Sequence, residues 1–567
     1  MTGNFKLRIR LIFAGIIFLA LFFGLRLFFL QVIQSEAYTD LADRQSLNQT
    51  TETFKRGEIY FAKRGDLPVP AATSKQEFTV SANPRLINNP AAVYDELNPL
   101  LDLNREDFIA RMSNDERVFE VVATGLTPAL AETIKDLNLR GIFLEKTTKR
   151  FYPAGRTASH VLGLLAYQDD QLAGRYGLEK HYEDILAQSE SDSLAGFFSE
   201  IFLGLGNVIL QREKSQGDLV LTIDIVAQNT LEDELTRTFE RWQATSAGGI
   251  VMDPQTGAIL AMAALPDFNA SVGVKDINLL PNPLVEKVYE MGSVIKPLTI
   301  AAGLDAGVIT ANTTYFDAGC LVLNTRQICN YDGRARGTVD MQTVLNQSLN
   351  TGVIFVSQQL GHRAFADYML GFGLGEPTGI DLPNEVTSLV SNLKSNRDIE
   401  HATASFGQGI ALSPIATIRA FATLANGGQL VRPHVVDRIK LEDGQERPTE
   451  VRTDPSAIDP SAAAAITAML VNTVDEALAG GVYKMEHYQV AAKTGTAQMV
   501  DNTTGGYYDD RFLHSFFGYF PASEPRFIVF LYLIDPRGAP YASETLSEPF
   551  MNNAKFLLNY YEVPPDR

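Results

Sequence analysis

Ser293-Val294-Ile295-Lys296 is the stretch from which the interpretation of this chain starts, because two further short motifs follow it in order. They are Ser348-Leu349-Asn350 and Lys493-Thr494-Gly495-Thr496, and all three lie in the C-terminal half of a 567-residue chain. Such a set can supply a serine nucleophile, a lysine base and groups that hold a substrate. We therefore interpret the three motifs as parts of one serine acyl-transfer site.

The first motif is expected to supply the nucleophile and its base. If Ser293 opens a helix, Lys296 lies one turn further on the same face, and its amine can reach the serine hydroxyl. A serine hydroxyl is a weak nucleophile near neutral pH and needs a neighbouring base. Lysine can be that base only when its pKa falls, which burial and a second cation both cause. Lys493 is the candidate for the second cation.

The second motif is expected to handle the leaving group. The Ser348 hydroxyl can relay a proton toward a leaving amine. The Asn350 side chain can hold Lys296 and a substrate amide in register. Whether Lys296 or Ser348 is the working base in each half-reaction stays open at this stage.

The third motif is expected to bind the substrate along a strand. The apolar stretch that precedes Lys493 predicts this strand. Gly495 lets a peptide backbone approach closely, and the hydroxyl groups of Thr494 and Thr496 could bind a terminal carboxylate. The expected oxyanion donors are the backbone N–H groups of Ser293 and Thr496, and losing one such donor costs roughly 3–4 kcal/mol of transition-state stabilisation.

Single copies of these motifs carry little information. Ser391-Asn392-Leu393-Lys394 also matches S-x-x-K, and Ser46-Leu47-Asn48 matches S-x-N. Taken alone, either pattern is functional in about one case in ten and is otherwise part of a solvated helix or loop. However, no S-x-N lies between Ser391 and Lys493, and no S-x-x-K precedes Ser46. Only the set that starts at Ser293 is complete and in order.

The ordered set resembles that of class B penicillin-binding proteins, the monofunctional peptidoglycan transpeptidases. The resemblance extends over nearly the whole chain, with three departures. Met291 stands where proline is common, Val490-Ala491-Ala492-Lys493 has alanine where the family often has glycine, and Phe61-Ala62-Lys63-Arg64-Gly65 lacks the usual aspartate before the arginine. The other segments that carry it are Tyr289-Glu290-Met291-Gly292, Ser405-Phe406-Gly407-Gln408-Gly409, Arg56-Gly57-Glu58-Ile59-Tyr60, Arg150-Phe151-Tyr152-Pro153, His160-Val161-Leu162-Gly163 and Gly177-Leu178-Glu179.

The resemblance implies an α+β fold with a membrane-anchored pedestal and a penicillin-binding, serine β-lactamase-like transpeptidase domain. We expect a five-stranded antiparallel sheet with helices, from 249–253, 258–262, the strand before Lys493, 515–520 and 527–532. Helices near 456–479 are expected to cover its outer face. The expected boundaries are a cytoplasmic N-terminus at 1–10, a transmembrane anchor at 11–33, a non-catalytic, dimerisation-type pedestal at 34–218 and the transpeptidase domain at 219–562.

The resemblance also implies the substrate and the partners. Ser293 would attack the penultimate carbonyl of a peptidoglycan stem peptide that ends in D-Ala-D-Ala, and the amine of a neighbouring stem would accept the acyl group. β-Lactams would acylate the same serine, and no cofactor is needed. The chain lacks the Glu-Asp-x-x-Phe glycosyltransferase signature. A SEDS-type glycosyltransferase and other division or elongation proteins are therefore the expected partners. Between these two roles, the sequence of the 493–521 region resembles that of division proteins.

Four alternative functions stay open. A D,D-carboxypeptidase or a β-lactamase would use the same serine with water as the acceptor. A β-lactam sensor or a non-catalytic wall scaffold could keep the fold. The large pedestal argues against the two hydrolases. The three complete motifs argue against a non-catalytic scaffold.

Composition restricts the partners and the compartment. The formal net charge of −19 argues against a nucleic-acid partner, which requires a basic surface. The seven histidines and two cysteines are not spaced as zinc ligands. An apolar run at 11–33, interrupted by Arg26 and preceded by Lys6, Arg8 and Arg10, predicts an uncleaved anchor with a cytoplasmic N-terminus and an extracytoplasmic bulk. A cleaved signal peptide is the alternative.

Two local features add to this interpretation. If Asn324-Thr325 forms a hairpin turn, Cys320 and Cys329 face each other at a separation that a disulfide tolerates, and free thiols in a loop are the alternative. Apolar residues between 194 and 205 follow helical spacing. That stripe packs either on the pedestal itself or on the bilayer or a membrane partner.

Overall fold

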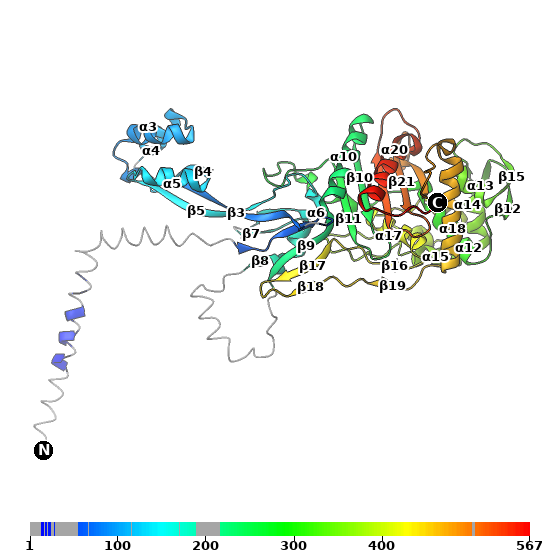
Figure 1. Cartoon of the computed structure of the whole chain (residues 1–567), viewed down its shortest axis with the longest axis horizontal. Coiled ribbons are helices and arrows are strands. Elements are labelled where there is room, and N and C mark those ends of the chain that lie inside the picture. The colour runs from blue at the N-terminus through cyan, green and yellow to red at the C-terminus, as the bar shows by residue number, and fades with distance from the viewer. Residues whose placement is uncertain are drawn as a thin grey trace, which may run out of the picture. The chain divides into compact units, whose positions relative to one another are not determined.

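The computed structural model describes residues 55–65, 67–114, 116–168, 171–188, 216–501 and 505–567, with scattered helical positions between 13 and 28. Two compact units are drawn in Figure 1. Ser74–Lys149 belong to the first unit, and Arg56–Thr73 and Arg150–Arg567 form the second. Most of the expected anchor at 11–33, and all of the apolar stripe at 194–205, lie outside the described residues.

The first unit is a small α+β structure with its own core. Its helices start at polar caps, since the side chains of Asn89, Asn104 and Thr127 each accept a hydrogen bond from the first turn. Apolar side chains from the helices and strands, including Leu97, Phe108 and Ile134, meet in this core. Its elements are α3 (Pro90–Leu101), α4 (Arg105–Met112), β4 (Glu120–Leu126) and α5 (Pro128–Asp136), with parts of β3 (Val69–Ala82) and β5 (Ile142–Phe151).

The second unit is built on the antiparallel sheet that the sequence predicts. The strand order is β11-β10-β22-β21-β20, which confirms the five-stranded sheet. The bounds are β10 (Ser246–Met252), β11 (Ile259–Leu265), β20 (Ala491–Asp501), β21 (Gly506–Phe520) and β22 (Phe527–Ile534). One detail differs, because β20 begins at Ala491 and contains the whole Lys493–Thr496 motif, whereas the sequence placed this motif at the end of a strand.

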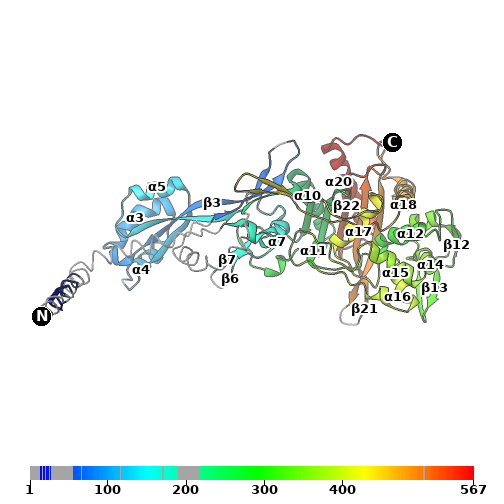
Figure 2. The ribbon, with the colours of Figure 1, turned by 90° about the horizontal axis from the view of Figure 1, so that it is seen from below.

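Both faces of this sheet are buried, which explains why β22 is a continuous apolar run. Successive side chains of a strand point to opposite faces, so neighbouring residues of β22 enter different cores. Val529 and Leu531 pack with α10 (Ile225–Arg241) and α20 (Ser547–Tyr560). Phe530 and Tyr532 belong to the core that α12 (Lys296–Asp305), α17 (Pro414–Ala425) and α18 (Pro460–Asn472) cover (Figure 2).

The expectation that the helices near 456–479 cover the outer face is wrong. Helix α18 packs against α12 and β20, on the face that also carries the first motif. Among the described residues, the segment Pro460–Gly481 is long and apolar enough to span a bilayer by length and composition. Its apolar residues Ile466, Met469 and Leu470 are instead buried within the unit.

A second group of strands in the same unit joins strands from the N-terminal and the C-terminal halves of the chain. β9 (Gly217–Asp224) pairs with β2 (Ile59–Ala62) and with β17 (Val436–Leu441), so Leu219–Asp224 is not part of the five-stranded sheet. Nearby, the buried Glu179 carboxylate accepts from Arg56 Nε at 2.6 Å and Arg150 Nε at 2.7 Å. Buried ion pairs therefore connect the pedestal-like segments that contain Arg56, Arg150 and Glu179.

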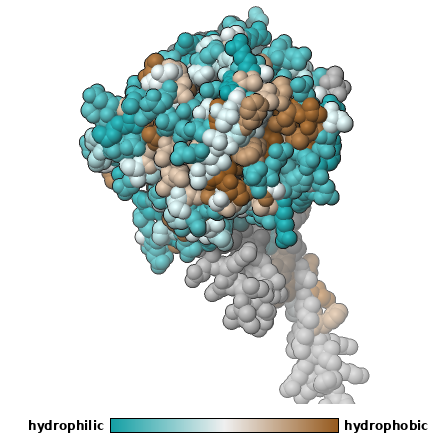
Figure 3. Space-filling view, turned by 90° about the vertical axis from the view of Figure 1, so that its right-hand side faces the viewer, coloured by the Kyte–Doolittle hydropathy of each residue, from teal (hydrophilic) through white to brown (hydrophobic). Residues whose placement is uncertain are grey.

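Short elements complete the second unit. They are β1 (Lys55–Arg56), α6 (Ser159–Leu162), β6 (Leu165–Gln168), β7 (Gln171–Gly174), α7 (Gly177–His181), α8 (Glu183–Leu186), β8 (Ala187–Gln188), α11 (Pro283–Glu286), β12 (Thr314–Asp317), β13 (Cys320–Leu323), β14 (Arg326–Cys329), β15 (Gly337–Asp340), α13 (Met341–Asn346), α14 (Asn350–Leu360), α15 (His362–Gly371), α16 (Asp398–Ala404), β16 (Leu430–Val431), β18 (Glu446–Pro448), β19 (Thr453–Asp454) and α19 (Ala542–Thr545). Figure 3 looks onto the end of the unit that carries β12 and β15. That face is mostly hydrophilic and its apolar areas are separate patches.

Candidate active site

The three motifs lie on four different elements of the second unit. Ser293 belongs to a 3₁₀ turn, η4 (Gly292–Ile295), and Lys296 is the first residue of α12. Ser293 therefore lies in a 3₁₀ turn that runs directly into α12, and is not the first residue of that α-helix. Ser348 precedes α14, and the Lys493–Thr496 motif lies in β20.

Glycines allow the nucleophile segment to lie directly against β20. A Cβ atom on Gly495 would be 2.8 Å from the backbone nitrogen of Val294 and would collide with the Ser515 hydroxyl. Gly292 has φ +66°, and a Cβ there would be 2.8 Å from the carbonyl oxygen of Thr496. The Ser515 hydroxyl donates to the Met291 carbonyl at 2.8 Å. The first and third motifs are thus brought together although they are two hundred residues apart.

Lys296 joins the first motif to the second. Its side chain is fully buried, and its amine donates to the carbonyl oxygen of Ser348 and, at 3.1 Å, to the Ser348 hydroxyl. Ser348 has φ +53°, a left-handed conformation that costs energy for a residue with a side chain. The lysine amine therefore lies where a proton could pass between it and the Ser348 hydroxyl.

Burial lowers the pKa of both lysines of the site. For Lys296 the pKa lies well below the ordinary 10.5, first because burial penalises the ammonium form and second because Lys493 repels it. Burial lowers the pKa of Lys493 to about 8. Both amines therefore give up a proton more readily than an exposed lysine does, which is what a base beside Ser293 requires.

We expect the rate of acylation by a β-lactam to have a bell-shaped pH profile. As the pH falls through the lowered pKa of Lys296, this amine takes up a proton and loses its function as a base. Above pH 8, Lys493 loses its charge and its attraction for a substrate carboxylate, because its pKa is about 8. Stopped-flow acylation rates between acid and alkaline pH test this expectation.

The control for this profile is Lys493→Arg, which keeps its charge throughout the pH range. This variant should lose the alkaline limb while keeping the acid limb. An alkaline limb that is unchanged in Lys493→Arg would contradict the attribution of this limb to the loss of charge on Lys493.

Asn350 contacts a neighbouring loop. Its side-chain amide donates to the carbonyl oxygen of Cys329 at 2.9 Å, and the Lys296 amine donates to Ser348. Cys329 belongs to the β13–β14 hairpin, where it pairs directly with Cys320, and a disulfide joins the two. Asn324 and Thr325 form the hairpin turn, with φ +43° and +69°. Asn350 thus connects its motif to a cross-linked loop.

The structure adds residues that the motif chemistry missed. The Gly292 N–H donates to the Gly407 carbonyl at 3.1 Å, and the Gly409 N–H donates to Glu290 Oε1 at 3.0 Å. The Tyr507 hydroxyl donates to the same carboxylate, and burial raises the pKa of Glu290. The signal for this contact was present, since Glu290 lies in Tyr289–Gly292 and the two glycines in Ser405–Gly409, but nothing in the sequence paired them.

The strand that carries the third motif has one of its hydroxyl groups already engaged. Thr496 Oγ1 accepts from the backbone N–H of Ala542 at 3.1 Å, which ties the end of the third motif to α19. The amine of Lys493 donates to the Thr494 carbonyl at 3.2 Å.

By contrast, the competing S-x-x-K at Ser391–Lys394 forms a 3₁₀ turn that packs on α15 and α16.

Comparisons with known proteins agree with this geometry. A family model described as the penicillin-binding protein transpeptidase domain matches residues 247–554, more than half of the chain. The chain belongs to the penicillin-binding protein transpeptidase family. A model of the penicillin-binding protein dimerisation domain matches residues 51–193. The class B resemblance is thereby confirmed.

Relatives of this penicillin-binding protein match it over most of its chain. It is similar to stage V sporulation protein D of Bacillus subtilis, 29% identical over 97% of this chain and 85% of that protein. A probable peptidoglycan D,D-transpeptidase FtsI of Caulobacter vibrioides is 31% identical over 75% of this chain and 67% of that protein. Penicillin-binding protein 3 of Mycobacterium tuberculosis complexed with aztreonam has a TM-score of 0.64 and 26% identity, covering 75% of this chain and 92% of that one.

Proposed function

We propose that this protein is a peptidoglycan D,D-transpeptidase that cross-links stem peptides through an acyl-enzyme on Ser293. The observation that carries the proposal is the fully buried Lys296 amine, whose pKa is lowered and which donates to Ser348. A neutral amine at the first motif can accept the proton of a serine hydroxyl. The family and the names of the D,D-transpeptidase relatives supply the substrate class.

The proposed acylation step needs only groups of these motifs. Lys296 takes the hydroxyl proton as Ser293 Oγ attacks the penultimate D-alanine carbonyl carbon. The backbone N–H groups of Ser293 and Thr496 stabilise the resulting oxyanion. As the C–N bond breaks, the proton returns from Lys296 through the Ser348 hydroxyl to the leaving D-alanine amine.

The second step reverses these proton movements. The amine of a neighbouring stem peptide attacks the ester carbonyl and loses a proton to the same relay. The bond to Ser293 Oγ then breaks, and the serine recovers its proton. Charged Lys493, together with Thr494, Gly495 and Thr496, is the proposed holder of the donor peptide and its terminal carboxylate, and a β-lactam would enter the same place.

The proposed placement of the protein follows from its N-terminal sequence and its relatives. We place an anchor at 11–33 with residues 1–10 in the cytoplasm, a pedestal at 34–218 and the transpeptidase domain at 219–562, outside the cytoplasmic membrane. The described positions between 13 and 23 are helical and their apolar side chains are exposed, which supports an anchor. A SEDS-type glycosyltransferase and division proteins are the proposed partners, with division favoured by the FtsI relative of Caulobacter vibrioides.

Products made by the purified full-length protein test the proposal. With a donor stem peptide and an acceptor stem in excess, we expect D-alanine release and cross-linked dimer in nearly equal amounts. A D,D-carboxypeptidase would release D-alanine without a dimer, because water would take the acyl group. Release of D-alanine that does not depend on the acceptor, with no dimer, would overturn the transpeptidase assignment.

A further inference from the structure

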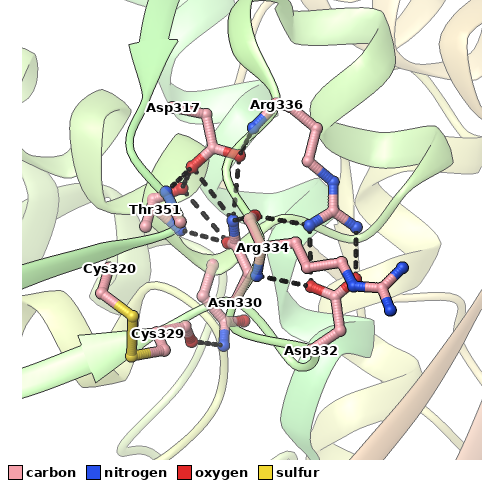
Figure 4. Close-up of a disulfide and its surroundings, with 10 residues drawn as sticks. Asp317, Cys320, Cys329, Asn330, Asp332, Arg334, Arg336 and Thr351 are labelled. Atoms are coloured by element: carbon pink, nitrogen blue, oxygen red, sulfur yellow. Dashed lines mark hydrogen bonds and ion pairs between the residues drawn. A yellow bond between two sulfur atoms is a disulfide. The ribbon is translucent and has the colours of Figure 1, made fainter.

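The carboxylate of Asp317, at the end of β12, is buried and holds several parts of the site region together. Its side chain is 0% exposed. Oδ1 accepts from Gly319 N at 2.9 Å, Asn330 Nδ2 at 3.0 Å and Thr351 Oγ1 at 2.8 Å, and Oδ2 accepts from Asn330 Nδ2 at 3.0 Å and Arg336 N at 3.1 Å (Figure 4). All these donors are neutral groups, and the nearby positive charge of Arg336 adds an electrostatic attraction to the buried carboxylate.

Asn330 connects the Asp317 carboxylate to the start of α14. The first backbone N–H groups of a helix need acceptors from outside the helix. Leu349 stands at the N-cap position and has no side chain that can accept. Asn330 Oδ1 accepts from the Thr351 N–H at 3.2 Å, although Asn330 lies 21 residues upstream. The oxygen of Asn330 therefore caps α14 while its amide group is held by Asp317.

The start of α14 is also the second catalytic motif. Asn350 is its first residue, and its side chain donates to the carbonyl of Cys329, the residue next to Asn330. Ser348 lies two residues earlier in the left-handed conformation and accepts from Lys296. A shift of α14 would therefore move the Ser348 hydroxyl away from the lysine amine.

We propose that Asp317 and Asn330 are positioning residues, which act through α14 to keep the Ser348 hydroxyl within reach of Lys296 during acylation. The inference rests on the proposed roles of Ser293, Lys296 and Ser348. Neither Asp317 nor Asn330 touches the reacting atoms. Their effect is to hold a strained serine in one orientation.

A carboxylate is required at 317 because both of its oxygens accept and neither donates. In Asp317→Asn, one oxygen becomes an NH₂ group that faces the amide of Asn330 or the N–H of Arg336. Donor then meets donor inside a closed site, and a buried group is left unsatisfied. The variant keeps the shape of the side chain and changes these bonds together with the charge that attracts Arg336.

The test compares acylation by a fluorescent penicillin in folded wild type and Asp317→Asn. We expect the saturating acylation rate to fall about tenfold or more, because misplacing catalytic groups by about 1 Å costs up to about 100-fold. The apparent affinity for the penicillin should change less than about threefold, since a positioning defect acts on the chemical step. Labelling should still reach one per chain after long incubation.

Asp381→Asn is the matched control. Asp381 is also buried, and its carboxylate accepts from Val435 N at 2.7 Å, Val436 N at 3.0 Å and the Tyr182 hydroxyl at 3.0 Å. It contacts none of the three motifs through these bonds. Its replacement should lower the melting temperature about as much as Asp317→Asn, by a few degrees. The acylation rate of the folded protein should remain within about twofold of wild type.

Two further variants keep the proposal testable if Asp317→Asn folds poorly. Thr351→Val removes one donor to Asp317 and should slow acylation about two- to fivefold. The exchanged pair Asp317→Asn with Asn330→Asp restores one donor and acceptor between these positions and should acylate faster than Asp317→Asn alone.

A folded Asp317→Asn protein that acylates at the wild-type rate would overturn the inference. So would equal slowing in Asp381→Asn, or an exchanged pair that is no faster than the single variant. Failure of the proposed function is recognised separately, because Ser293→Ala would then still be labelled.

Discussion

Ser293→Ala is expected to abolish covalent labelling by a fluorescent penicillin, while the protein keeps its fold and melting temperature. The alanine has no oxygen to attack the β-lactam carbonyl, and removing a catalytic serine lowers turnover by about 10⁶-fold in enzymes of comparable chemistry. Ser293 is only partly buried, so losing its hydroxyl leaves no unpaired group in the core. Gel fluorescence after incubation with the label, with circular dichroism of the same sample, makes the measurement.

Ser391→Ala is the control for this result. Ser391 begins the other S-x-x-K in the chain and lies in a 3₁₀ turn with Lys394. Its exposed side chain can be shortened without a packing defect, so labelling should equal that of wild type. If labelling survived in Ser293→Ala and disappeared in Ser391→Ala, the nucleophile would be assigned to the wrong motif.

Lys296→Met is expected to lower the acylation rate by about 10²–10⁴-fold, the usual contribution of a positioned general base. Methionine fills a similar volume but accepts no proton from Ser293. The stopped-flow acylation rate measures the loss. A rate within threefold of wild type would show that another group is the base.

The same variant should cost little or no stability. Because the pKa of Lys296 is lowered in the folded state, the unfolded chain binds more protons between that lowered pKa and 10.5. Stability therefore rises with pH across this window, and below it the folded state carries the full cost of a buried ammonium group. Methionine removes this cost and leaves Ser348 without a donor, which costs about 1–3 kcal/mol. The two effects oppose each other, so thermal unfolding should shift by no more than a few degrees.

The strands of the catalytic unit could be predicted because their apolar pattern is strong. The stretches at 515–520 and 527–532 lie within the five-stranded sheet, and those at 249–253 and 258–262 each extend one residue beyond their strands. Errors occurred where the local pattern is ambiguous. α18 is apolar and alanine-rich, and such a helix can lie on an outer face or pack against a neighbour, so its pattern did not reveal that α12 and β20 cover it.

The chemistry of the site was also largely predictable, but its contacts were not. Lys493 could be named as the cation that lowers the pKa of Lys296, because two buried ammonium groups disfavour each other's charge. The partner of Asn350 could not be named. Its bond goes to a backbone carbonyl of Cys329, and every residue carries such a carbonyl, so nothing in the sequence distinguishes this one.

The amino-acid sequence by itself determined the three ordered motifs, the sheet that carries the third of them, the cysteine hairpin and the family to which they belong. Local periodicity and residue chemistry are sufficient for these features. Tertiary structure alone decided that Ser348 holds the amine of Lys296, that Glu290 joins Gly409 and Tyr507, and that Asp317 caps α14 through Asn330. Each of these bonds joins residues far apart along the chain, and burial decides which of many possible partners a polar group must find.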